Sequence, residues 1–433
     1  MPAHVVVGTQ WGDEAKAAVG DKMAETASIV ARGNGGANAG HTVEVEGKKF
    51  IFHLLPCGIF QPNVRMNILG NGMVIDLELL DKEIKEASQT AKEFGLSVED
   101  RIMLSLRAHV TMPYHRVLEK NRKNGSGNGS AVGATTMKAI STTYSDKSSY
   151  RGIQVCDLLE RDRFIAAINE TLGEYNHLLT YRNPGFRPFT ADAIYEELHP
   201  YIGTIKRISG DSGSLIRRAY NDKEIILLEA AQGTMLSVEH GSYRWVSASS
   251  GTAGGVAEGV SLPPNALNRI IGVIKAYITR VGNGPFPTKI KDDKLQDFFR
   301  RVGNEYGATT GRPRDCGWLD LLIAKFAKEI NGLTEAVITK IDVLDGLDPV
   351  LICTGYKHNG LILTELPCDS RLLYECVPVF KVFKGWKKTA GCHEWKEFPK
   401  EAREYLYWIQ DQLQIPITMV KNGPGREQFV IPN

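Results

Sequence analysis

The sequence has no apolar run approaching the roughly 20 residues that a membrane-spanning helix needs, so an integral membrane protein is not expected. The N-terminal stretch MPAHVVVGTQ lacks the charged and then apolar segments of a secretory signal, and we expect none. Neither sign of charge dominates, because 52 lysines and arginines face 50 aspartates and glutamates. This balance does not predict a general attraction to nucleic acid or to a membrane surface.

Cysteine pairs of the C-x-x-C type are also missing. The cysteines are odd in number and irregularly spaced: Cys57, Cys156, Cys316, Cys353, Cys368, Cys376 and Cys392. Such a set predicts neither a disulfide framework nor a zinc site. We interpret these residues as ordinary reduced thiols and expect a cytoplasmic protein.

The chain has 433 residues, of which 42% are hydrophobic, and this is ample for a large core. Internal repeats and long low-complexity linkers are missing, so we expect residues 1–433 to form one domain. Short apolar runs of the buried-strand type occur at His4–Val7, Ile29–Ala31, Ile225–Leu228 and Val337–Ile341. Residues 42–55 read as a hairpin that turns at Glu46-Gly47.

Segments with helical periodicity alternate with these predicted strands. We expect helices from about Lys16, from Asp76 to Gly95, and over Leu267–Tyr277, Trp318–Ile330 and Pro399–Leu413. Lys123–Ser130 reads as a loop because of its glycine, serine and asparagine content. The alternation predicts an α/β fold with a large, mostly parallel sheet and helices on both faces. Sheets of this kind bind ligands at the carboxyl ends of their strands.

The first glycine-containing loop, GTQWGDEAK, spans Gly8 to Lys16 between a predicted strand and a predicted helix. Backbone N–H groups and the positive helix end would face an anion there, which suits phosphate. The loop is not a Walker A motif, because Lys16 lies four residues after Gly12 and no Ser or Thr follows it. Asp13 and Glu14 could hold magnesium or act as a base. The alternative is an acidic helix N-terminus that the dipole favours.

The second loop, NGGANAGHT, spans Asn34 to Thr42 and contains His41 near its end. Its glycines indicate close approach of the backbone to another group. The histidine could donate to a phosphate oxygen or to an oxyanion. A tight structural turn with an exposed histidine explains the loop equally well.

Two further segments suggest ligand contacts. TKIDVLDG, from Thr339 to Gly346, follows an apolar strand with a Lys-x-Asp pair. Many GTP-binding proteins read guanine with such a pair, although a strand-capping turn would look the same. GATTGRPRD, from Gly307 to Asp315, brings hydroxyls and arginines together as a clamp for carboxylates would. A solvated basic loop is the alternative there.

Together these segments resemble the adenylosuccinate synthetase family. The resemblance runs from Val5 to about Gln428, and its stretches occur in the family's order: VVVGTQWGDE, NGGANAGHTV, FHLLPCGIF, EAAQGTMLSVEHGSY, IKAYITRVGNGPFPT, EYGATTGRPRDCGWLD, TKIDVLDGL and GPGREQ. It implies a P-loop-NTPase-like fold around a mostly parallel sheet, in a cytoplasmic homodimer. It also implies a ligase of purine nucleotide biosynthesis that joins IMP and L-aspartate with GTP and Mg²⁺.

The resemblance also implies roles for individual residues. Asp13 would be the base and, with the Gly40 carbonyl, a magnesium ligand. His41 would be the acid, and Lys16 and Gln232 would complete the catalytic set. The substrates IMP and L-aspartate would be bound by Asn38, Thr136, Ser247, Thr309, Thr310 and Arg312. GTP would be bound by Gly12, Thr42, Arg314, Lys340 and Asp342.

The sequence departs from the family in two clusters. After Glu14 the family has Gly-Lys-Gly-Lys, whereas this chain has Ala15, Lys16, Ala17 and Ala18. The second cluster is TTMKAIST, over 135–142, where the family has TTGRGIGP. Tyr150 stands where the family has an arginine that reaches the neighbouring subunit's IMP, and Arg151 follows it. Lys421 stands at a base-binding position that is often a serine.

These departures leave three readings open. The first is the family's ordinary reaction in a divergent enzyme. The second is a paralogue that ligates aspartate to another acceptor, such as a guanine nucleotide or another cyclic amide. The third is a non-catalytic nucleotide-binding regulator, which the retention of both Asp13 and His41 argues against. The choice between GTP and ATP is also open at this point.

Overall fold

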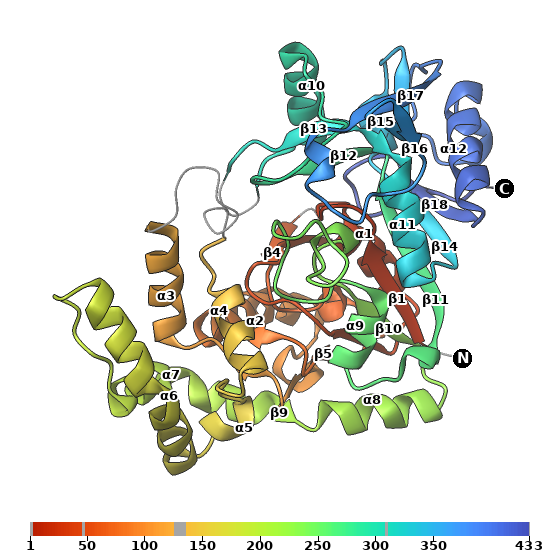
Figure 1. Cartoon of the computed structure of the whole chain (residues 1–433). Helices are drawn as coiled ribbons and strands as arrows, with labels where there is room; N and C mark the ends of the chain where they lie inside the picture. Colours follow the sequence, from red (N-terminus) through yellow and green to blue (C-terminus); the bar gives the residue numbers. More distant parts are fainter. Residues whose placement is uncertain (1–2, 46–47, 125–135, 308–310, 433) are drawn as a thin grey trace.

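The computed structural model of the chain describes residues 3–45, 48–124, 136–307 and 311–432 (Figure 1). Its main sheet is built from β1 (Ala3–Gly8), β2 (Ile29–Arg32), β5 (Met66–Leu69), β7 (Ile102–Ser105), β9 (Ser209–Gly210), β10 (Ile226–Glu229), β11 (Leu267–Lys275), β14 (Glu335–Thr339), β18 (Ile417–Lys421) and β19 (Phe429–Val430). The order is β19-β18-β14-β11-β1-β10-β2-β5-β7-β9. Only β18 and β19 pair antiparallel among these neighbours in the described residues. The predicted mostly parallel sheet is confirmed.

A second, smaller sheet contains β12 (Tyr277–Arg280), β13 (Asp315–Asp320), β15 (Val350–His358), β16 (Leu361–Leu363) and β17 (Val377–Phe383). Two two-stranded pairs complete the strands: β3 (His41–Val45) with β4 (Lys48–Phe52), and β6 (Val74–Ile75) with β8 (His109–Val110). The β3–β4 pair is the hairpin predicted over 42–55, and its turn at 46–47 lies outside the described residues.

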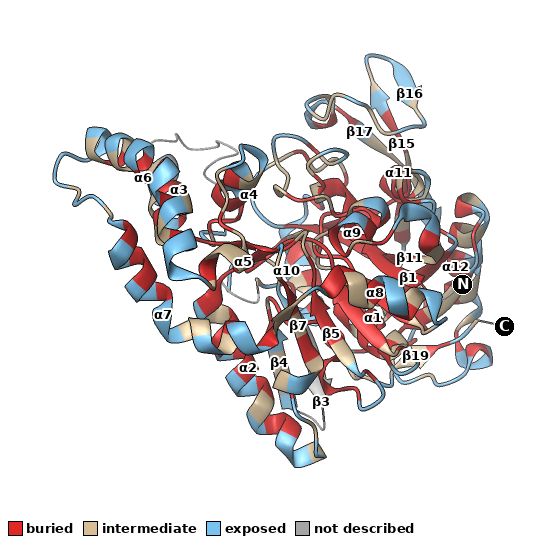
Figure 2. Cartoon of the chain, turned by 90° about the horizontal axis from the view of Figure 1, so that it is seen from below, coloured by how far each residue is buried: buried red, intermediate tan, exposed pale blue. Residues whose placement is uncertain are grey.

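Helices cover both faces of the main sheet. The helices of the described residues are α1 (Lys16–Ala24), α2 (Leu77–Ala91), α3 (Pro113–Asn124), α4 (Ile140–Ser148), α5 (Val155–Leu158), α6 (Arg161–Arg182), α7 (Ala191–Ile208), α8 (Ser212–Asn221), α9 (Ala253–Gly259), α10 (Asp293–Gly303), α11 (Leu321–Asn331) and α12 (Lys400–Leu413). Helices α1, α2 and α7 pack on one face, and α8, α9, α11 and α12 on the other. In Figure 2 the central strands are buried and the outer sides of the helices are exposed.

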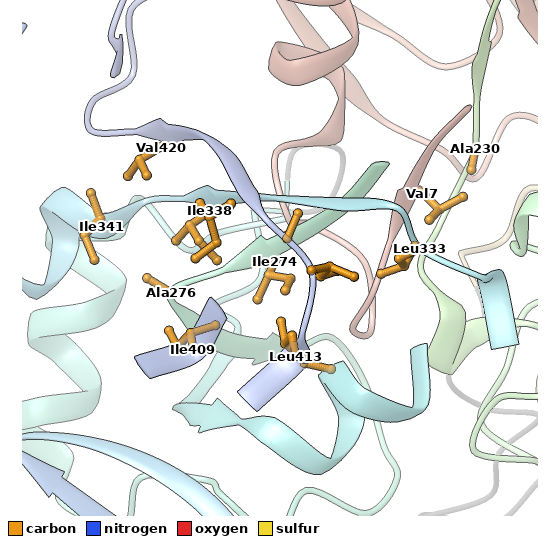
Figure 3. Close-up of a cluster of buried hydrophobic side chains, with 14 of the residues drawn as sticks. Val7, Ala230, Ile274, Ala276, Leu333, Ile338, Ile341, Ile409, Leu413 and Val420 are labelled. Carbon is orange, nitrogen blue, oxygen red and sulfur yellow. The ribbon is translucent and has the colours of Figure 1, made fainter. Parts of the chain in front are cut away.

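The sheet is buried on both faces, which explains why its strands are apolar without alternation. Val6 points into the core on one face, and its neighbours Val5 and Val7 point into the core on the other. Figure 3 shows the second core, where Ile409 and Leu413 of α12 lie near Ile274 and Ile338. Among the described residues, no helix combines the length and the hydropathy needed to cross a membrane.

The helix predicted over Leu267–Tyr277 is wrong, because this segment forms β11 and the start of β12. The spacing of Ile270, Ile271 and Ile274 imitated a helical face. Strand β11 lies between β1 and β14 and buries apolar residues on both sides, so its hydrophobic residues need not alternate. Its β-branched residues suit the strand that packing imposes.

The helix predicted over Trp318–Ile330 is correct only in its later part. Trp318 belongs to β13, and the helix α11 begins at Leu321. Asp320 caps it by accepting a hydrogen bond from the backbone N–H of Leu322 at 3.2 Å. The remaining predicted helices and strands are present, with Asp76 as the cap of α2 and a left-handed Gly95 after it.

The position of Ile338 in the second core generates a stability test. Ile338→Ala removes a fully buried side chain from β14, so we expect the free energy of unfolding to fall by about 2–5 kcal/mol. Ile362, which is 54% exposed in β16, provides the control, and Ile362→Ala should change it by no more than about 0.5 kcal/mol. Urea unfolding followed by circular dichroism measures both. Equal losses in the two variants would contradict this assignment of the core.

Candidate active site

One cleft of about 2530 Å³ runs along the carboxyl ends of the central strands. The segments that follow β1, β2, β10, β14 and β18 all contribute to its wall. The predicted site residues that line it are Gly12, Asp13, Lys16, Asn38, Gly40, Thr136, Gln232, Ser247, Arg314, Lys340 and Asp342. The expected ligand edge of the sheet is therefore where most of the predicted residues meet.

Glu14 holds the first loop in shape. Its buried carboxylate accepts hydrogen bonds from the backbone N–H groups of Gln10 at 2.9 Å and Gly12 at 3.0 Å. The Lys16 ammonium donates to its other oxygen at 2.6 Å. A side chain at Gly8 would bring its Cβ within 2.5 Å of this carboxylate, so only glycine fits there. Of the two acids in the loop, Glu14 is thus committed to the loop itself, and Asp13 remains for chemistry.

Asp13 lies in the cleft, with Oδ2 at 2.9 Å from Nε of Arg314. Its backbone is left-handed, with φ of 60°, as are those of Gly12 and Ala15 with φ of 85° and 62°. Left-handed residues other than glycine are uncommon and concentrate at functional sites. The turn brings the Asp13 carboxylate to the N-terminal end of α1, where the helix dipole favours negative groups.

The loop after β2 is tied to the loop after β10. Asn34 accepts from the backbone N–H of Ala231 at 2.9 Å, and the Asn38 amide donates to the Ser247 hydroxyl at 3.3 Å. Ser249 donates to the side-chain oxygen of Gln232 at 3.2 Å. These bonds bring Asn38, Ser247 and Gln232 together on one wall of the cleft.

His41 and Thr42 are the first residues of β3, and the structure describes their backbone but not their side chains. Thr309 and Thr310 lie outside the described residues. Arg312 is exposed and, in the part of the chain that the structure describes, is not among the residues that line the cleft. The aspartate clamp expected from GATTGRPRD therefore stays a prediction.

Lys340 and Asp342 lie directly after β14, in the segment for which the sequence predicted contacts with a guanine base. Lys340 has a left-handed backbone with φ of 57°, and its ammonium donates to the Gly303 carbonyl at 2.6 Å and to Glu305 at 2.7 Å. Burial raises the pKa of the Asp342 carboxyl above its ordinary value. Lys421 also lines the cleft, where its ammonium donates to the Gly425 carbonyl at 2.6 Å.

Sequence reasoning missed two charged residues beside the cleft. Arg280 is almost fully buried and lies over the Trp11 ring, with 4.6 Å from its guanidinium carbon to the ring centroid. Glu305 is fully buried and contacts both Arg314 and Lys340. Single charges have no periodicity or spacing that would mark them as buried, so the sequence carried no signal for either.

The structure separates the unusual residues into two groups. Ala15, Met137 and Ala139 have φ of 62°, 58° and 57°, in the region that glycine adopts without strain. Ala17 and Ala18 lie within α1 and Ser141 within α4, where alanine and serine fit an ordinary helix. Only the first group therefore carries backbone strain in place of glycine.

The comparisons with known proteins cover almost the whole chain. The family model described as adenylosuccinate synthetase matches residues 5–430. The adenylosuccinate synthetase of Halothermothrix orenii is 42% identical over 99% of this chain and 98% of its own. That of Pelotomaculum thermopropionicum is 41% identical over 100% and 99%.

Solved structures agree with these similarities. The fully ligated adenylosuccinate synthetase of Plasmodium falciparum matches with a TM-score of 0.90 at 33% identity, over 100% of both chains. The succinoaminodeoxyadenylate synthetase of cyanophage S-2L, bound to dGMP and dATP, matches with a TM-score of 0.60 over 99% of this chain and 95% of its own. At 19% identity the second likeness concerns the fold alone.

The strained Ala15 and the unstrained Ala17 generate a paired test. Ala15→Gly should raise the free energy of unfolding by up to about 1 kcal/mol, because glycine adopts this backbone without the Cβ penalty. Ala17→Gly should lower it by about 0.5–1 kcal/mol, because glycine is a poor helix former. Chemical denaturation of both variants provides the measurement, and a loss of stability in Ala15→Gly would refute the strain.

Proposed function

The chain belongs to the adenylosuccinate synthetase family, and we propose that its cleft performs the family's ligation of L-aspartate to IMP with the residues named above. The enzyme is a GTP-dependent ligase of purine nucleotide biosynthesis, and its products are adenylosuccinate, GDP and phosphate. The observation that carries the proposal is that Asp13, Lys16, Gln232 and Asp342 line one and the same cleft. A binding protein would have no need of a base placed beside a phosphate loop.

The purine 6-oxo group is a poor leaving group, so it must first be phosphorylated. Asp13 would remove the proton from N1 of IMP, and the resulting 6-oxyanion would attack the γ-phosphorus of GTP. GDP leaves, and the 6-phosphoryl group is then displaced by the amine of L-aspartate, which forms the C–N bond and releases phosphate. Phosphoryl transfer depends on positioning and on charge neutralisation, which Lys16 and the backbone donors of the first loop would supply. His41 would act as the acid that supports the transferring group.

The donor set near Asp13 fits magnesium. Mg²⁺ usually takes one or two protein carboxylates and completes its shell with phosphate oxygens and water. Asp13 and the Gly40 carbonyl line the same cleft and would hold the ion, whose positive charge would help to neutralise the phosphates. In the described residues no group of three or more acidic, histidine or cysteine side chains forms a metal site of its own.

GTP would occupy the end of the cleft near β14. The Asp342 carboxylate would accept hydrogen bonds from N1 and the 2-amino group of guanine. The stem of Lys340 would pack against the ring, while Gly303 and Glu305 hold its ammonium. Gly12, Thr42 and Arg314 would contact the phosphates. The Asp342 carboxylate would make guanine the preferred base and GTP the energy donor.

L-aspartate and IMP would share the other end. Thr309, Thr310 and Arg312 would hold the aspartate carboxylates, because paired arginine and hydroxyl donors suit that group. Asn38, Thr136 and Ser247 would contact IMP. The chain would act as one domain over residues 1–433 in a cytoplasmic homodimer. Arg151 would serve the neighbouring subunit in place of the family's arginine, whose position Tyr150 occupies. Tyr150 is 97% exposed, and Arg151 lies 3.0 Å from Glu174.

Phosphate release tests this function directly. With GTP, Mg²⁺ and L-aspartate present, phosphate should appear only when IMP is added, and mass spectrometry should find the succinyl adduct of the purine nucleotide. Asp13→Ala and His41→Asn should each lower kcat by about 10²–10⁴. Asp192→Ala, which removes an exposed carboxylate of α7, should leave kcat unchanged. IMP-independent release, or none with every substrate saturating, would sink the proposal.

A further inference from the structure

Glu305 lies behind the cleft wall, where its buried carboxylate accepts hydrogen bonds from four side chains. Oε1 accepts from Tyr277 at 2.5 Å, Lys340 at 2.7 Å and Lys275 at 3.2 Å. Oε2 accepts from Arg314 at 2.8 Å. We call these five residues the Glu305 cluster. Glu305, Lys275 and Tyr277 have no exposed surface.

The Glu305 cluster places several charged groups away from water, and this is energetically costly unless the charges compensate one another. Burial by itself raises the pKa of Glu305, but Lys275, Lys340 and Arg314 outweigh burial, and the net pKa lies well below its usual range. Burial lowers the pKa of Lys275 below its ordinary value, although Glu305 opposes this shift. Buried charges are costly unless they are paired. The arrangement therefore holds only while Glu305 keeps its negative charge.

The members of the cluster reach different ends of the active site. Arg314 extends from Glu305 to Asp13, the base, at 2.9 Å. Lys340 extends to the guanine end, two residues before Asp342, and both line the cleft. Lys275 lines no part of the cleft in the described residues; its ammonium also donates to the Thr279 hydroxyl at 2.5 Å and lies 5.0 Å from the centroid of the Tyr277 ring. Lys275 can therefore affect the reaction only through its partners.

We propose that Glu305 is a positioning residue that fixes Arg314 with one carboxylate oxygen and Lys340 with the other. It thereby keeps the guanine end of the cleft in its place relative to Asp13. Lys275 is its counter-charge and compensates Glu305 from the protein side. The inference rests on the proposed function, because it assigns guanine to Lys340 and Asp342.

A purely structural role for Glu305 makes a different prediction. Variants that remove either one or both charges of the Glu305–Lys275 pair distinguish the structural role from the positioning role. Glu305→Gln leaves Lys275 buried without a carboxylate, which destabilises the fold. Glu305→Gln combined with Lys275→Met removes both charges of this buried pair. Stability should then recover, but Arg314 and Lys340 still lack their common anchor.

The experiment compares the wild type with these two variants in melting temperature, in GDP affinity by calorimetry, and in kcat and KM for IMP. Glu305→Gln should melt lower, bind GDP about tenfold more weakly and lose about a hundredfold in kcat, as misplaced catalytic groups do. KM for IMP should stay within about threefold, because Asn38, Ser247 and Gln232 are held by a separate set of bonds. The double variant should regain its melting temperature but not its GDP affinity or kcat.

Glu99→Gln is the matched control, since this partly exposed glutamate is not one of the described residues that line the cleft and pairs with the surface residue Arg207 at 2.9 Å. Recovery of GDP affinity and kcat together with stability in the double variant would show that Glu305 is merely structural. So would an equal weakening of GDP and IMP in Glu305→Gln. If neither variant folds, Tyr277→Phe removes a single donor from Glu305. A lower kcat at an unchanged melting temperature then supports the proposal, and an unchanged kcat overturns it.

A wild-type enzyme that releases no phosphate would refute the proposed function and not the positioning role. GDP affinity is measured without IMP or aspartate, so its loss in the double variant would still support Glu305 as the anchor of the guanine end. Its retention would still count against that role.

Discussion

The burial of the main sheet on both faces is the constraint on which the site depends. Most side chains of its central strands are shielded from solvent on both faces, so the polar groups that can meet a ligand gather where the strands end. Because β1, β2, β10, β14 and β18 run in the same direction, five loops from distant parts of the chain meet at one edge. The cleft therefore follows from topology first, and the residue types in those loops then decide its chemistry.

The charged groups around the cleft are arranged in layers. Asp13, Lys16 and Asp342 line the cleft, while Glu14 and Glu305 are fully buried. Glu14 accepts hydrogen bonds from Lys16 and from backbone N–H groups, and Glu305 accepts them from Arg314 and Lys340, so these cations have little freedom to turn. Electrostatic stabilisation of a transition state is strongest where such groups need no reorganisation.

The sequence predicted the strands that have short apolar runs and the loops that follow them, because glycine and charge punctuate a strand end clearly. It failed at β11, where burial on both faces removed the alternation that distinguishes a strand from a helix. Asp13, Lys16 and Asp342 were singled out from their local motifs and Gln232 from the family resemblance, and all four line the cleft. Glu305, Lys275 and Arg280 were not singled out, because their importance lies in partners that are distant in sequence.

The closure of the first loop by Glu14 has a consequence for the cost of binding. A flexible glycine-containing loop loses conformational entropy when it wraps a phosphate, and that loss weakens the observed affinity. Glu14 fixes Gln10, Gly12 and Lys16 through hydrogen bonds within the chain, so most of this loss falls on folding and not on binding. The nucleotide would then meet a loop whose shape is set in advance, and its binding free energy would be reduced less by the ordering of this part of the chain.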